Sequence, residues 1–164
     1  MSYQFEAMSE KHRRPVIDIF NYYIRSSQAA FPDVPVGHDF YDHFLRMTQG
    51  YPAIVVYDDA QVVGFAMLHP YHRATTFKRT AEITYFLKPD HTRKGLGARI
   101  LNEFTHQAES MGVDTLLACI SSLNLTSLRF HQKHGFSECG RLARIGRKFG
   151  QDFDVVWMQK HLKD

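Results

Sequence analysis

A short segment with two glycines constrains this chain more than any other stretch of its sequence. Gly95 and Gly97 follow Arg93 and Lys94, directly after a run with strand character and directly before a run with helical periodicity. The unpaired N–H groups at the first turn of a helix carry partial positive charge, and glycines let an anion approach the backbone without meeting a Cβ. The segment therefore predicts either a phosphate-binding turn or a turn in which glycine is only punctuation.

Helical and strand-like segments alternate along the rest of the chain. In the helical segments apolar residues recur about every 3.6 positions, whereas β-branched apolar runs bounded by Asp, Gly or Pro indicate strands. Helices are expected over residues 14–25 and 38–48, between the glycine turn and Gly112, and from the N-cap Asn124 to about residue 134. Strands are expected over residues 3–8, 53–57, 61–68, 79–88, 115–120, 136–145 and 152–159.

This order of elements predicts an α/β fold in a single domain over residues 1–164. Hairpins near both ends flank a central strand–helix–strand unit, and the first hairpin turns at Asp58-Asp59-Ala60. We expect a mixed, mostly antiparallel sheet of about seven strands with helices on both faces. The central unit supplies two parallel strands, and the glycine turn lies between them in sequence.

Composition limits the classes of partner. Lys and Arg outnumber Asp and Glu by 20 to 17 and are scattered, which suits a small anionic ligand. No recognition helix or aromatic-and-basic strand pattern is present, so nucleic acid is not expected. No run approaches the roughly 20 apolar residues of a membrane span, and no signal peptide is apparent, so we expect a cytoplasmic protein without membrane contact. Histidine pairs at 69/72 and 131/134 lack further ligands at metal spacing, so no metal is expected.

Two segments resemble cofactor-binding motifs of the GNAT superfamily of N-acetyltransferases. Residues 92–97 resemble its pyrophosphate turn, Gln/Arg-x-x-Gly-x-Gly/Ala, with Thr92 where Gln or Arg is usual. Residues 124–136 resemble its second segment, Asn-x-x-Ser/Ala-x-x-x-Tyr/His-x-x-x-Gly-Phe. The resemblance covers nearly the whole chain and is closest to the phosphinothricin and methionine sulfone acetyltransferase group. It implies a GNAT-like fold, acetyl-CoA as cosubstrate entering where the two parallel strands separate, and a homodimer.

The resemblance also implies which residues bind the cofactor. On a helix, Asn124, Ser127 and His131 share one stripe, which suits the pantetheine arm; alternatively Asn124 only caps the helix and His131 is solvated. Because Thr92 is not a cation, we expect the pyrophosphate to be bound by backbone amides and by the side chains of Arg93 and Lys94. The expected cofactor-binding residues are Tyr85, Phe86, Leu87, Arg93, Lys94, Gly95, Leu96, Gly97, Ala98, Asn124, Ser127 and His131.

Acetyl transfer to an amine needs a base for the ammonium proton and usually a proton for the departing thiolate. Glu82, on the strand that enters the glycine turn, is the expected base, or else an ordinary glutamate paired with Arg79. His131 is the expected donor to sulfur, with Tyr85 or water as alternatives. By resemblance, the backbone groups of residues 85–87 pair with pantetheine and polarise the thioester carbonyl.

The acceptor is expected to be a small amino-acid-like primary amine of the phosphinothricin, methionine sulfone or methionine sulfoximine type. Arg73 and Arg79 are candidate ligands for its carboxylate or phosphinate, although surface solubility also explains them. Phe31 is expected to line the aliphatic part of the pocket, and Glu82 to touch the amine. Acetylation of a polyamine or a peptide N-terminus, and a non-catalytic acetyl-CoA sensor, are the alternatives.

Overall fold

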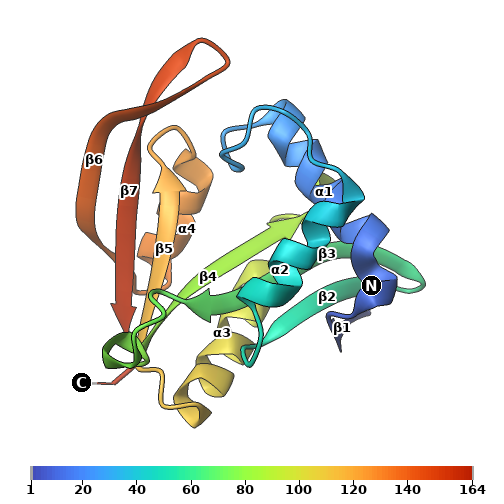
Figure 1. The fold of residues 1–164 in the computed structure, drawn as a ribbon, viewed down its shortest axis with the longest axis horizontal. Helices are drawn as coiled ribbons and strands as arrows, with labels where there is room; N and C mark the ends of the chain where they lie inside the picture. The colour runs from blue at the N-terminus through green and yellow to red at the C-terminus, as the bar shows by residue number, and fades with distance from the viewer. Residues whose placement is uncertain (1, 164) are drawn as a thin grey trace.

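The computed structural model describes residues 2–163 and contains one seven-stranded sheet with helices on both faces (Figure 1). The strand order is β1-β2-β3-β4-β5-β7-β6, and every neighbouring pair is antiparallel except β4 and β5. The predicted fold class is confirmed. The strands are β1 (Tyr3–Ala7), β2 (Ala53–Asp58), β3 (Gln61–Pro70), β4 (Thr80–Leu87), β5 (Thr115–Ser121), β6 (Ser137–Lys148) and β7 (Gln151–His161). The helices are α1 (Arg13–Ser26), α2 (Tyr41–Met47), α3 (Leu96–Ser110) and α4 (Leu125–Lys133).

Each face of the sheet has its own apolar core. On one face, α1 and α2 pack against β2, β3 and the end of β4, with Ile17, Phe44 and Phe65 buried among them. On the other face, α3 packs against the central strands through residues such as Ile100 and Phe104, and Leu128 of α4 borders the same core. A fully buried side chain of this size contributes roughly 1.5–3 kcal/mol. The apolar residues that recur at helical spacing in the sequence are the ones buried in these two cores.

The last hairpin is longer than the sequence suggests. Strand β6 continues through Gly146 to Lys148, and the chain turns at Phe149 and Gly150, both with positive φ. The expected strand ends at residue 145, whereas Gly146 lies inside β6 opposite Phe153, whose ring packs across it. A Cβ at Gly146 would lie 2.2 Å from that ring.

A buried lysine connects the loop after α1 to the last hairpin. The Lys148 ammonium donates to the carbonyls of Ser27, at 2.7 Å, and Ala30, at 2.6 Å, and Lys148 is only 3% exposed. Phe31, in the same loop, stacks on Phe153 of β7 with ring centroids 5.9 Å apart. Figure 1 shows this loop reaching from α1 toward the hairpin of β6 and β7. The contacts hold the loop beside the half of the sheet that α1 and α2 leave uncovered.

Candidate active site

The central parallel strands are joined along only a short length. Paired positions of β4 and β5 run from Thr80 with Thr115 to Glu82 with Leu117, and beyond Glu82 the strands separate (Figure 1). The remainder of β4 pairs with β3 on its other edge, up to Leu87. Polar groups of the β4 backbone on the β5 side therefore have no strand to bond with. An extended polar ligand placed between the two strands can bind these groups as a strand would.

The glycine turn lies at the open end of this gap, directly before α3. Gly95 caps the helix with φ of 81°, a left-handed conformation that glycine adopts without strain, and Arg93 takes φ of 60°. The first hydrogen bond of α3 runs from the Arg99 N–H to the Gly95 carbonyl. The N–H groups of Leu96, Gly97 and Ala98 thus have no acceptor within the helix, which is the arrangement that binds an anion.

Gly97 is required for a different reason from the one suggested by the sequence. A Cβ at Gly97 would lie 3.2 Å from the ring of Phe130 on α4, tighter than normal packing. By contrast, a Cβ at Gly95 would meet nothing within 4 Å, so its positive φ explains the glycine there. Gly97 therefore brings α3 and α4 together, whereas Gly95 shapes the turn.

Thr92 occupies the position where the resemblance leads one to expect Gln or Arg. Its hydroxyl donates to the Pro89 carbonyl at 2.8 Å, which closes the short helical turn at Pro89–His91. The side chain thus stabilises the local backbone. Arg93 and Lys94 supply the positive side chains of this segment, and both are exposed.

Glu82 lies at the point where β4 and β5 separate, on the sheet face that carries α1 and α2. It is half-buried, and its Oε2 lies 3.7 Å from Nε2 of His69, which is directly opposite on β3. Burial raises the pKa of Glu82, whereas the charge of His69 lowers it. From β5, the Cys119 thiol feels the same carboxylate, and burial raises its pKa to about 12. The environment suits a carboxylate that accepts a proton, with a neutral thiol beside it.

Tyr85 and His131 form a hydrogen-bonded pair on the opposite face. Residues three apart on a strand point to opposite sides, so Tyr85 packs into the core beneath α3 while Glu82 does not. The Tyr85 hydroxyl lies 2.5 Å from Nε2 of His131, and Nδ1 of His131 lies 2.7 Å from the Ser127 carbonyl. A carbonyl only accepts, so Nδ1 bears the hydrogen and Nε2 accepts from Tyr85.

This pairing argues against His131 as the proton donor to sulfur. Burial lowers its pKa to about 4, and the side chain is 3% exposed. The neutral ring has its single proton committed to the Ser127 carbonyl and a lone pair toward Tyr85. Burial also raises the pKa of Tyr85, so its hydroxyl stays protonated. In this arrangement His131 accepts a hydrogen bond from Tyr85, and a proton for the thiolate is more readily supplied by another group.

The expected stripe on α4 has mixed roles. The Asn124 side chain accepts from the Ser127 N–H at 3.2 Å, so Asn124 does cap the helix. Asn124 and Ser127 are partly exposed, but His131 is buried in the protein rather than solvated.

Two expected cofactor-binding residues at the end of β4 already have partners. Phe86 packs against Phe20, and the Leu87 carbonyl accepts a hydrogen bond from the Tyr23 hydroxyl.

The structure separates the two expected anion-binding arginines. Arg79 forms a bidentate contact with Asp114, from Nε to Oδ1 at 3.0 Å and from Nη2 to Oδ2 at 2.6 Å. This pair lies just before β4 and β5 begin. Arg79 was expected to bind the acceptor, but its guanidinium is bound to Asp114 instead. Arg73 lies in the exposed loop between β3 and β4. Phe31 is 43% exposed, and one of its ring faces is covered by Phe153.

No role in the reaction is expected from the sequence for three residues of this region: His69, Tyr23 and Lys148. The expected strand ends at residue 68, whereas β3 continues through His69 to Pro70, and a connection of nine exposed residues, 71–79, hides which residue of β4 faces His69. The contacts of Tyr23 and Lys148 join residues 64 and at least 118 positions apart in sequence. No local pattern marks such pairs.

Two further observations concern metals and membranes. Within residues 2–163, no group of three or more His, Cys, Asp and Glu side chains is placed to hold a metal ion. In the same part of the chain, no helix is both long and apolar enough to cross a bilayer.

Comparison with known proteins gives consistent similarities. The model of the acetyltransferase (GNAT) family matches residues 16–136. The L-methionine sulfoximine/L-methionine sulfone acetyltransferase of Pseudomonas paraeruginosa is 30% identical, covering 90% of this chain and 87% of its own. The phosphinothricin N-acetyltransferase of Streptomyces viridochromogenes is 30% identical, with 88% and 80% covered. The structure of yncA from Salmonella typhimurium, solved with its cofactor acetyl-CoA, has a TM-score of 0.89 at 26% identity and covers 100% of this chain and 96% of that one.

Proposed function

The chain belongs to the acetyltransferase (GNAT) family, and from this premise we propose that it transfers the acetyl group of acetyl-CoA to the primary amine of a small amino-acid-like acceptor. One observation carries the proposal: the gap between β4 and β5 joins the glycine turn before α3 to the carboxylate of Glu82. A pyrophosphate at the turn and an acetyl group near Glu82 fit the two ends of this gap. The relatives named above act on acceptors of this kind.

The turn and the open edge of β4 hold the cosubstrate. The N–H groups of residues 96–98 and the side chains of Arg93 and Lys94 bind the pyrophosphate. The unpaired backbone of β4 beyond Glu82 binds the pantetheine arm, and the partly exposed Asn124 and Ser127 border it from α4. Residues 92–95 are exposed and the first three N–H groups of α3 have no acceptor within the helix, so the residues present fit the cosubstrate.

Glu82 takes the proton of the acceptor ammonium, which frees the nitrogen lone pair for attack on the thioester carbonyl. Its raised pKa brings it closer to that of an amine and makes the transfer easier. His131 holds Tyr85 in the opposite wall of the gap and acts as a positioning residue. The departing thiolate receives its proton from the nitrogen that has just been acylated, directly or through water.

The acceptor class rests on the relatives and on the residues around Glu82. Arg73 is the candidate that remains for the acceptor's carboxylate or phosphinate, and Phe31 lies on the loop held by Lys148. A thiol-release assay with acetyl-CoA tests methionine sulfone, methionine sulfoximine, phosphinothricin, a polyamine and peptide N-termini in parallel. We expect turnover with the first three compounds. Preferential turnover of the polyamine or peptides would replace this acceptor class.

Calorimetry with coenzyme A separates a silent binding domain from an enzyme. Saturable binding with no turnover across the amine panel would indicate a sensor rather than a transferase. Absence of saturable binding would overturn the proposed function altogether. Location in the cytoplasm and assembly into a homodimer stay predictions, which fractionation and sedimentation measurements test.

A further inference from the structure

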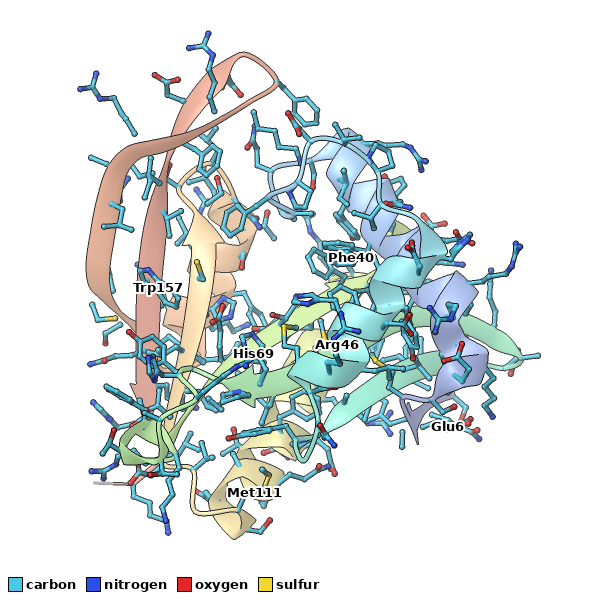
Figure 2. The ribbon with its side chains drawn as sticks, viewed as in Figure 1. Glu6, Phe40, Arg46, His69, Met111 and Trp157 are labelled. Atoms are coloured by element: carbon cyan, nitrogen blue, oxygen red, sulfur yellow. The ribbon has the colours of Figure 1, made fainter. Side chains whose placement is uncertain are left out.

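His69 and Glu82 are paired residues of two antiparallel strands. Directly opposite residues on one face of such a pair have Cβ atoms about 4.5–5.5 Å apart, so their side chains meet. Here Nε2 of His69 lies 3.7 Å from Oε2 of Glu82, and the side chains are 16% and 20% exposed. Figure 2 shows His69 on this region of the sheet, between Arg46 of α2 and Trp157 of β7 in that view. The contact is therefore partly shielded from water.

The second ring nitrogen of His69 determines where its proton lies. Nδ1 is 3.2 Å from the Pro70 carbonyl oxygen, which can only accept a hydrogen bond. In the neutral ring Nδ1 therefore carries the hydrogen, and Nε2 presents a lone pair to Glu82. When Glu82 is ionised, two acceptors face each other. One added proton, whichever of the two residues holds it, gives this contact a donor and an acceptor; the two atoms lie 3.7 Å apart, so the side chains must approach each other for the proton to pass between them.

The groups around this pair leave it as an isolated proton-binding unit. From β5, Leu117 lies beside Glu82 and is apolar, and Cys119 contributes a thiol that burial keeps neutral. Within residues 2–163, His69 and Cys119 are the ionisable side chains found to interact electrostatically with Glu82. Burial has the larger effect on the pKa of Glu82 and raises it, and His69 is the neighbouring charge that opposes this rise.

We propose that His69 is the second proton acceptor of the reaction and receives at Nε2 the proton that Glu82 takes from the acceptor ammonium. This inference rests on the proposed function. The ammonium gives one proton to Glu82, which passes it to His69 and returns to the carboxylate. The amine then forms the C–N bond, the C–S bond breaks, and the second nitrogen proton goes to the thiolate. His69 releases its proton to solvent, so each turnover yields one amide, one thiol and one proton.

Two variants separate proton acceptance from orientation. His69→Gln keeps a neutral hydrogen-bond donor near Glu82, whereas His69→Phe keeps only the ring shape. We expect both to lower kcat about tenfold, because Glu82 alone still provides part of the roughly 10²–10⁴-fold gain of proton transfer. We also expect the acid limb of the kcat/KM profile to change in both variants, because the proposed wild-type reaction needs an ionised Glu82 and a neutral His69, whereas the variants need only the ionised Glu82. His106→Gln, at an exposed position on α3, is the matched control.

A turnover-independent readout uses protein labelled with ¹³C at glutamate carboxyl carbons. The signal missing from Glu82→Gln assigns Glu82. The charge of His69 lowers the pKa of Glu82, so we expect the Glu82 carbon to titrate at higher pH in His69→Gln and His69→Phe than in the wild-type protein. An unchanged midpoint in both variants, or a Gln variant with wild-type kcat and pH profile, would overturn the inference.

The same measurements keep this inference distinct from the proposed function. If no amine supports turnover, the proposed function fails while the carbon titration still reports whether the pair shares a proton. If turnover occurs but His69→Gln behaves as wild type, the function stands and His69 has only a structural part. Coenzyme A affinity should be unchanged in every variant, because His69 lies away from the glycine turn.

Discussion

The ring of Phe130 lies 3.2 Å from the point that a Cβ on Gly97 would occupy. The beginning of α3 therefore packs on α4 at a place where a Cβ would be closer to the Phe130 ring than ordinary packing allows. In this way one glycine positions the two helices that border the gap between β4 and β5.

Gly97→Ala should destabilise the protein. Overpacking costs typically 1–3 kcal/mol, and the better helix propensity of alanine returns up to about 1 kcal/mol, so a net loss of about 1 kcal/mol is expected. Urea unfolding measures it. In a Phe130→Leu background, where the ring is removed, the same substitution should be neutral or stabilising. An equal loss in both backgrounds would contradict the packing role.

Glu82→Gln should lower kcat at least tenfold while the affinity for coenzyme A changes little. Glutamine keeps the size of the side chain but cannot accept the ammonium proton. Steady-state kinetics and calorimetry test the two parts separately. The wild-type enzyme should also lose activity as the pH falls through the raised pKa of Glu82, because the protonated carboxyl is not a base. Turnover of the variant at the wild-type rate would exclude Glu82 as the base.

His131 should make the protein less stable in mild acid. Its pKa is about 4 when folded, against about 6.5 in the unfolded chain, so the unfolded state binds more protons between these values. Stability therefore falls as the pH falls, by about 2 kcal/mol between pH 7 and pH 5. The double variant His131→Phe with Tyr85→Phe removes both polar partners and should lose this part of the slope. His12 is present in both proteins, so its contribution cancels; an unchanged slope would refute the assignment.

Lys148→Met should loosen the loop that carries Phe31. The substitution leaves the Ser27 and Ala30 carbonyls without their donor, at a cost of about 2 kcal/mol. We expect a higher KM for the acceptor, with coenzyme A affinity unchanged, because the loop lies away from the glycine turn. Arg147→Met, at an exposed neighbouring position, is the control. A wild-type KM in the lysine variant would show that the loop does not shape the acceptor site.

Arg73→Met and Arg79→Met should differ in their effect on the acceptor. Arg79 is committed to Asp114, so its loss should leave the acceptor KM within about twofold of wild type. Loss of Arg73 should raise that KM about tenfold or more, as expected for a charge-assisted hydrogen bond to a carboxylate. Kinetics with one acidic and one neutral acceptor make the comparison specific. A large effect at Arg79 would contradict the structural assignment.

The fold could be predicted because its signals are local. The buried face of α1, the runs of β2 and β3, and the glycine after α3 each occupy one contiguous stretch. The glycine turn and α4 were predictable for the same reason, since their motifs lie within a few residues. The end of β6 could not be predicted in this way. Gly146 leaves room for the ring of Phe153, which lies across the hairpin, and no neighbouring residue signals this contact.

The acceptor side of the site depends on contacts between distant residues. The pairing of Arg79 with Asp114 spans 35 positions, and the contact of Tyr85 with His131 spans 46. The low pKa of His131 has no local signal in the sequence, because its burial and its contact with Tyr85 arise only when the chain folds. Side-chain chemistry suggests candidate residues, but the hydrogen-bond partners and burial of each candidate come from the folded structure.

The short junction between β4 and β5 has a consequence for stability as well as for chemistry. A molecule lying in the gap and bonding to both strands acts as the strand that the sheet lacks there. Filling the gap should make the protein harder to unfold, by about 1.4 kcal/mol for every tenfold rise in free ligand above its Kd. Heat resistance of the folded chain should thus report how much acetyl donor surrounds it.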